Sequence, residues 1–172
     1  MASLRPAKCY RRVEKPYTRQ SQRKPRKGYV KGVPDPKIHK FEVGDPKKKF
    51  TLKLYLISND AVQIRHNALE ASRISLNKAL TKHIGKDAFF MKILVYPHHV
   101  LRENPLATGA GADRFQTGMR KAFGKPIGTA AQVRVGQKLI EVRVNKEKEA
   151  GAKKALKITG SKLPVTYRIV LE

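Results

Sequence analysis

Basic residues interleaved with tyrosines fill the N-terminal part of the chain and offer the chemistry of nucleic-acid binding. Residues 1–31 hold 11 lysines and arginines against one acid, Glu14, and Tyr10, Tyr17 and Tyr29 stand among them. Cations bind phosphates, and tyrosine rings stack on unpaired bases or pack against sugars. We therefore predict an extended basic arm that RNA orders. A disordered basic tail, in which the tyrosines have no role, is the alternative.

A second basic group is expected on a short helix at residues 113–124. The aspartate at its start suits an N-cap, and the glycine at its end suits a C-terminal stop. Its apolar face should consist of Phe115, Met119, Ala122 and Phe123. The helical period places Arg114, Gly118 and Lys121 together on another face, where an RNA backbone could lie directly on the helix. Close packing of Gly118 against protein, with the two cations merely solvated, is the alternative.

Residues that could support catalysis are scattered rather than grouped. The stretch Gly109–Gly111 lacks both the P-loop spacing and the full dinucleotide fingerprint. His98 and His99 are adjacent, so on a strand they would point to opposite faces and could not share one metal ion. Cys9 lies among cations but has no histidine or acid immediately beside it. The acids give no evident catalytic pair, so we expect no catalytic residues, no metal site and no cofactor.

The charge of the whole chain points to a polyanionic partner. The sequence has 38 Lys and Arg against 13 Asp and Glu, a formal net charge of +25 on 172 residues. Self-repulsion of this size opposes compaction unless a polyanion lies alongside, so nucleic acid is the expected partner. A protein of the membrane surface is the alternative on charge alone. It would need a strongly amphipathic basic helix or a lipidation signal, and the sequence has neither.

Length and cysteine content fit a single domain in a reducing compartment. A hydrophobic content of 40% is enough for a modest core. The lone Cys9 cannot form an intrachain disulfide. The strongest apolar run, Ala88–Tyr96, is interrupted by Lys92 and is shorter than the about 18 residues of a membrane span. A mitochondrial transit peptide is an alternative for the N-terminus, but prolines at positions 6, 16 and 25 would break its helix, so we expect a soluble cytoplasmic protein.

Hydrophobic periodicity predicts an α+β domain at residues 50–172, after an arm and proline-rich connection at residues 1–49. Alternating leucines predict a half-buried strand over Phe50–Ile57. A stripe formed by Leu69, Ser72, Leu76, Leu80 and His83 predicts a helix over Asn67–Ile84. Further strands are expected at Ala88–Tyr96, His99–Arg102, Thr129–Val135, Lys138–Val144 and Val165–Leu171, with a helix at Glu147–Ile158. The elements lack a strict βαβ rhythm, which favours α+β over a doubly wound sheet.

Several motifs resemble one family of large-subunit ribosomal proteins, the family that unites bacterial L-sixteen with archaeal and eukaryotic L-ten-e. The motifs are Gly111–Thr129, Val133–Gln137, Arg5–Arg11, Gly32–Ile38, Asn67–Arg73 and His99–Arg102. They keep the family's order and span roughly residues 5 to 144. The N-terminal and Asn67 motifs resemble the archaeal and eukaryotic branch, and the short C-terminal part favours an archaeal source. Gln132 departs from the arginine typical of the family.

The resemblance implies a hammerhead-like domain that binds large-subunit rRNA, joins late in assembly and helps to position A-site tRNA near the peptidyl transferase centre. The implied partners are rRNA, A-site tRNA with P-site tRNA as a further candidate, and neighbouring ribosomal proteins, with no membrane and no homo-oligomer. The family's loop toward that centre matches Arg102, Glu103, Asn104, Pro105, Leu106, Ala107, Thr108, Gly109, Ala110 and Gly111. The expected rRNA-binding residues are Arg5, Lys8, Tyr10, Arg11, Arg12, Arg19, Arg23, Lys24, Arg26, Lys27, Arg114, Gly118, Arg120, Lys121 and Lys125.

Three hypotheses follow for function: a ribosomal component, a non-ribosomal RNA- or DNA-binding module, and an rRNA-modifying enzyme. The long basic arm on a small core favours the first over the third, because an enzyme needs a concave polar site. Stoichiometry on mature large subunits would separate the first from the second.

Overall fold

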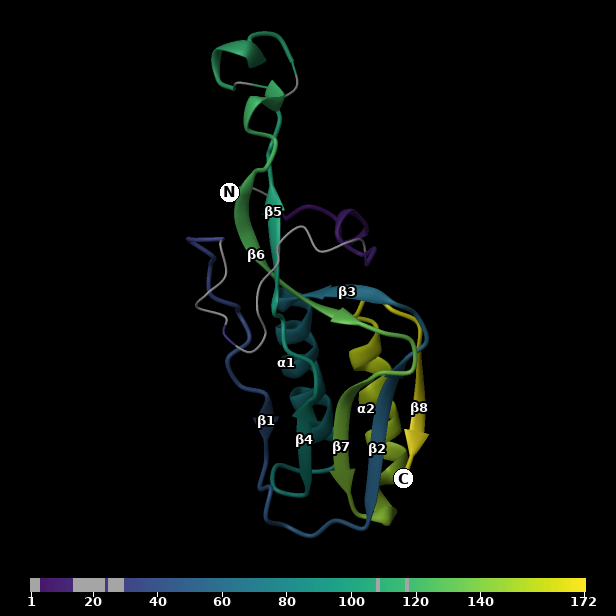
Figure 1. Ribbon diagram of the computed structural model, residues 1–172. Coiled ribbons are helices and arrows are strands. Elements are labelled where there is room, and N and C mark those ends of the chain that lie inside the picture. Colours follow the sequence, from purple (N-terminus) through teal and green to yellow (C-terminus); the bar gives the residue numbers. More distant parts are fainter. Residues whose placement is uncertain (1–3, 14–23, 25–29, 108, 117) are drawn as a thin grey trace.

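The computed structural model describes residues 4–13, 24, 30–107, 109–116 and 118–172. Within these residues it contains two α-helices and eight strands, which form two antiparallel sheets (Figure 1). The predicted α+β class is confirmed. No helix in the described ranges is both long and apolar enough to cross a bilayer.

The larger sheet forms the body of the molecule together with both helices. Its order is β1-β4-β7-β2-β8. The strands are β1 (Glu42–Val43), β2 (Leu52–Ser58), β4 (Phe89–Ile93), β7 (Lys138–Val144) and β8 (Tyr167–Leu171). The sequence predicts β7 with the same bounds and the other three long strands with ends that differ by a few residues. Leu54 and Leu56 of β2 join the core as their alternation predicts, but Tyr55 on the opposite face is buried too, beneath the ammonium of Lys138 at 3.8 Å from the ring centroid.

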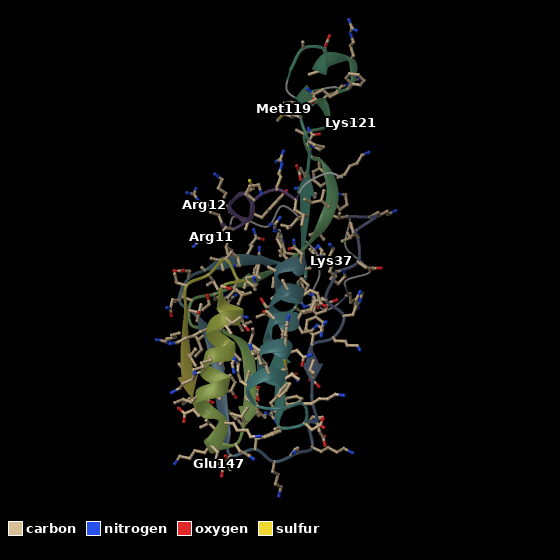
Figure 2. All side chains as sticks on the ribbon, turned by 180° about the vertical axis from the view of Figure 1, so that it is seen from behind. Arg11, Arg12, Lys37, Met119, Lys121 and Glu147 are labelled. Carbon is tan, nitrogen blue, oxygen red and sulfur yellow. The ribbon has the colours of Figure 1, made fainter. Side chains whose placement is uncertain are left out.

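Two helices cover one face of this sheet, α1 (His66–His83) and α2 (Glu149–Gly160) (Figures 1 and 2). Leu69, Ser72, Leu76 and Leu80 are buried, as the predicted stripe requires. His83 is exposed, which corrects the prediction. Since α1 ends at this point, the stripe passes to Ile84, four residues beyond Leu80, and Ile84 is buried instead.

A smaller sheet, of order β3-β6-β5, carries a hairpin away from the body (Figure 1). Its strands are β3 (Val62–Arg65), β5 (His99–Glu103) and β6 (Lys125–Val133). The sequence analysis did not predict β3. It predicted β6 only from Thr129, but the strand begins earlier because Gly128 and Pro126 pair with Leu101 and Arg102 of β5. The hairpin of β5 and β6 therefore projects beyond the core.

Residues 104–124, which we name the tip, join β5 to β6, and the described residues of the tip contain no α-helix. The predicted helix at residues 113–124 is wrong: two 3-10 turns, η3 (Ala112–Arg114) and η4 (Gly118–Lys121), take its place. Gly118 has a φ of +56°, which does not occur in the interior of a right-handed α-helix, so an α-helix cannot run through this position. The expected apolar face is exposed, with Phe115 at 87%, Met119 at 69% and Phe123 at 56%. A short amphipathic helix draws its stability from packing its apolar face, and the hairpin holds this segment where the body offers nothing to pack against.

Candidate nucleic-acid interface

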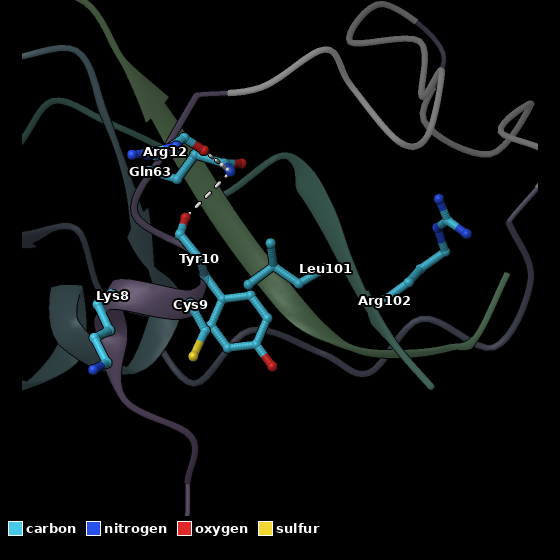
Figure 3. A pocket seen from close by; sticks show the side chains of 7 residues that line it. All are labelled: Lys8, Cys9, Tyr10, Arg12, Gln63, Leu101 and Arg102. Atoms are coloured by element: carbon cyan, nitrogen blue, oxygen red, sulfur yellow. Dashed lines mark hydrogen bonds between the residues drawn. The ribbon is translucent and has the colours of Figure 1, made fainter. Parts of the chain in front are cut away.

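The first part of the basic arm, residues 4–13, is docked on the smaller sheet. Gln63 of β3 holds it through three carbonyl groups (Figure 3). The Gln63 backbone N–H donates to the carbonyl of Arg11 at 2.9 Å, and its side-chain amide donates to those of Tyr10 at 3.2 Å and Arg12 at 2.8 Å. Because Gln63 is buried, these hydrogen bonds are shielded from water.

Tyr10 extends from the arm to the other edge of the smaller sheet. Its hydroxyl donates to Oε2 of Glu103 at 2.8 Å, and Arg5 pairs with Oε1 of the same carboxylate at 2.6 Å. The guanidinium of Arg65 lies over the Tyr10 ring, 5.4 Å from its centroid. Burial, with Glu103 as hydrogen-bond acceptor and negative charge, raises the pKa of Tyr10 to about 12. The hydroxyl of Tyr10 is thus engaged within the protein.

The neighbouring cations of the arm point outward. Lys8, Arg11 and Arg12 are exposed, and Figure 3 shows Lys8 and Arg12 directed away from the Tyr10 ring. Lys24 is exposed as well. Arg19, Arg23, Arg26 and Lys27 lie outside the described residues. Outward cations on a fixed backbone are the arrangement that phosphate binding requires.

Cys9 lies in a hollow of about 380 Å³ beside the Tyr10 ring and Leu101 (Figure 3). The residues that line it are Lys8, Cys9, Tyr10, Arg12, Gln63, Leu101 and Arg102. No histidine or acid is among them, so the hollow gives the exposed thiol no base.

The tip is closed by contacts between its two ends. The guanidinium of Arg102 donates to the carbonyl of Phe123 and stacks on that ring, 3.5 Å from the centroid. Gln116 forms two hydrogen bonds with Ala107, accepting from its N–H at 2.6 Å and donating to its carbonyl at 2.9 Å. Asn104 donates to the carbonyl of Gly118 at 3.4 Å. The tip is therefore a closed loop, on which Phe115, Met119 and Phe123 remain exposed.

Aromatic and cationic side chains meet on the surface of the tip. A cleft of about 740 Å³ has Phe115 and Phe123 in its lining, together with Arg114 and Lys121. Arg120 and Lys125 are exposed nearby in the sequence. Aromatic faces with cations beside them are what unpaired RNA binds, through stacking and phosphate contacts. Clustered exposed apolar side chains are also typical of a surface that binds a partner.

The arm and the tip occupy the same end of the molecule. Figure 2 shows Arg11 and Arg12 beside the base of the hairpin and Lys121 toward its end, while Glu147 lies at the opposite end of the body. The structure thus brings together two groups of predicted rRNA-binding residues that are about 100 positions apart in the sequence. It does not place Arg114, Gly118 and Lys121 on one helical face, because there is no helix.

The histidines behave as predicted. His98 is exposed and His99 is buried, so they face opposite sides. Burial, followed by the charge of Arg102, lowers the pKa of His99. Among the described residues, no group of three histidines, cysteines or acids could hold a metal ion.

The sequence analysis missed the role of Gln63 and Gln132 at this interface. The side-chain amide of Gln132 donates to Oε1 of Gln63 at 3.5 Å, so Gln132 supports the residue that anchors the arm. The sequence held only part of the signal. Val62, Gln63 and Ile64 alternate as in a half-buried strand, but that alternation predicts an exposed Gln63, and its burial comes from the docked arm.

Comparison with known proteins supplies the family. The sequence profile described as Ribosomal protein L16p/L10e matches residues 16–170. A Staphylothermus marinus protein described as large ribosomal subunit protein uL16 is 52% identical over 170 residues, 98% of this chain and 94% of the relative. Proteins with the same description are 46% identical over 170 residues in Methanococcus maripaludis, with the same coverage, and 52% identical over 169 residues in Saccharolobus islandicus, covering 96% of this chain and 91% of the relative. The chain therefore belongs to the ribosomal protein L16p/L10e family, in its archaeal branch.

Proposed function

We propose that this chain is a structural constituent of the large ribosomal subunit. It binds rRNA through its arm and through the cations of residues 114–125, and it uses residues 102–111 of the hairpin to help position A-site tRNA near the peptidyl transferase centre. Membership of a ribosomal protein family makes it a structural component and not an enzyme. The observation that carries the proposal is the shared end of the molecule at which the docked arm and the projecting hairpin meet (Figure 1).

Charge and exposure support the rRNA-binding part. Lys8 and Arg12 are exposed and make no ion pair with any described residue. Gln63 already fixes the backbone at Tyr10 and Arg12, so ordering this segment on RNA costs less conformational entropy than ordering a free tail. Release of counterions from the RNA then favours binding.

The shape of the hairpin supports the tRNA-positioning part. A closed tip at the end of two paired strands can reach past the surface that holds the body, and its side chains can contact a second RNA. The tip contains Asn104–Ala107 and Gly109–Gly111 of the loop matched by resemblance, whereas Arg102 and Glu103 belong to β5, and Thr108 lies outside the described residues. Late entry into the subunit fits a protein that docks on rRNA that has already folded.

Removal of tip cations tests which surface binds RNA. We expect that Arg114→Gln with Lys121→Gln lowers the slope of log affinity for large-subunit rRNA against log salt by about 2, because each phosphate contact contributes about 0.9. The control is Lys146→Gln with Lys154→Gln, which also removes two exposed cations, the first of them beside Glu147 at the opposite end of the body. Filter binding between 50 and 200 mM salt measures both slopes. Equal slopes in the two double variants would refute the assignment of Arg114 and Lys121 to rRNA binding.

Sedimentation of cell extract tests the ribosomal role itself. We expect about one copy per mature large subunit at low and at high salt, because contacts inside the particle hide the salt dependence of the isolated chain. Recovery on precursor particles only, or in the soluble fraction, would instead indicate an assembly module.

A further inference from the structure

We propose that Glu103 is a positioning residue that fastens the docked arm to the base of the tip, so that binding of the arm fixes the direction of the hairpin. The effect on tRNA positioning rests on the proposed function, whereas the coupling between the arm and the hairpin is a property of the isolated chain. We name the group formed by Arg5, Tyr10 and Glu103 the latch.

Glu103 stands where the hairpin leaves the body. It is the last residue of β5, and it pairs with Lys125, the first residue of β6. Its backbone also lies against Gly124, where an added Cβ would come within 2.6 Å of the Glu103 carbonyl carbon. A shift of Glu103 is therefore passed directly to both ends of the tip.

The latch joins this point to two residues of the arm. Both oxygens of the Glu103 carboxylate are occupied, one by the hydroxyl of Tyr10 and the other by Arg5. The Glu103 side chain is only 17% exposed, so these charge-assisted hydrogen bonds are partly protected from solvent. The same arm segment is anchored to the opposite edge of the sheet through Gln63.

Arg102, the residue before Glu103, keeps the tip closed through a separate contact, so the latch joins the hairpin only to the arm. Arg102 and Glu103 follow one another at the end of β5, and Arg102 holds the returning end of the tip through Phe123. Loss of the Glu103 contacts should therefore leave the tip closed but free to tilt about the end of β5. A tilting tip samples many directions, whereas a latched tip has one.

Pulsed electron spin resonance on the full chain measures this tilt. In a Cys9→Ser background, Ala110→Cys places one spin label on the exposed tip and Lys154→Cys places the other on an exposed site of α2. We expect a narrow distribution of distances between these labels in the otherwise unchanged protein. A wide distribution there would overturn the proposal at once.

Variants of the latch should widen the distribution. Tyr10→Phe and Glu103→Gln each remove part of it, and combining them should have less effect than the sum of the two, because they act on one contact. Arg5→Gln should widen the distribution, and Arg5→Lys, which keeps a charge opposite Glu103, should restore it. The matched controls are Tyr96→Phe and Glu42→Gln, which remove an exposed hydroxyl and an exposed carboxylate elsewhere and should change nothing.

Amide exchange of the arm separates coupling from folding. Loss of a hydrogen bond to a charged acceptor should raise exchange at the Tyr10 amide about tenfold, while the amides of β2 and β7 stay protected. Faster exchange in the arm with an unchanged tip distribution would overturn the latch. Neither measurement contains RNA, so this failure would be distinct from a failure to bind rRNA.

Discussion

Gly124 offers a sharp test of how the tip is held, because its backbone and its surroundings both exclude a side chain. Its φ is +72°, and a Cβ would lie 2.6 Å from the carbonyl carbon and 2.7 Å from the carbonyl oxygen of Glu103. Gly118 is the matched control, since its φ is +56° but a Cβ there meets nothing within 4 Å. The two glycines share the conformational requirement, and only Gly124 has the close approach.

The magnitudes for the two substitutions follow from this difference. Gly118→Ala should cost about 1 kcal/mol, the penalty of a left-handed backbone for alanine. Gly124→Ala carries the same penalty and must also move Glu103 away, which opens the last pair of β5 and β6, so we expect about 2–4 kcal/mol for the hairpin base. At about 2 kcal/mol, the opening equilibrium there rises roughly thirtyfold.

Hydrogen exchange followed by NMR measures these effects locally. In Gly124→Ala, the amides of β5 and of the first residues of β6 should exchange faster by this factor, while those of β2 and β7 should not change. In Gly118→Ala, the base of the hairpin should keep its protection. Equal exchange at the base in both variants would show that the close approach to Glu103 does not hold the tip.

Two further predictions concern the body. Leu56→Ala should lower the free energy of unfolding by about 2–5 kcal/mol in urea, because Leu56 is fully buried in β2, an interior strand of the larger sheet. Leu171→Ala, at an exposed position on the edge strand β8, should change it little, and similar losses in the two variants would contradict the burial of Leu56. His66 accepts the backbone N–H of Lys37 at 3.0 Å, and burial, followed by the charges of Lys37 and Arg65, lowers its pKa below 6.5. Its contribution to stability is present above pH 6.5 and is lost as pH falls toward its folded pKa, so the urea midpoint should drop on acidification. His66→Asn keeps an acceptor that does not titrate and should remove that part of the pH dependence, and an unchanged profile would refute the assignment.

The sequence predicted most of the body because its elements satisfy local and tertiary preferences at the same time. The stripe from Leu69 to Leu80 has the helical period and is the buried face of α1. The segment Lys138–Val144 is β7 with the predicted bounds. The excess of cations over acids likewise indicates a nucleic-acid partner from the sequence alone.

The prediction failed where local preference and tertiary position disagree. Residues 113–124 have a good cap and an amphipathic pattern, yet Phe115 and Met119 are exposed and the helix does not form. Their pattern describes a face that needs a surface to pack on, and the sequence does not say whether that surface comes from this chain or from a partner.

Sequence by itself determined what this protein is built from: a compact α+β core, a large positive charge and the motifs of its family. Tertiary structure decided where the charge is placed, because the pairing of β5 with β6 moves the tip away from the core and Gln63 brings the arm back to the base of the same hairpin. Contacts such as Tyr10 to Glu103 join residues 93 positions apart. No local pattern encodes a contact of that kind, since its energy exists only after the sheet has brought both residues together.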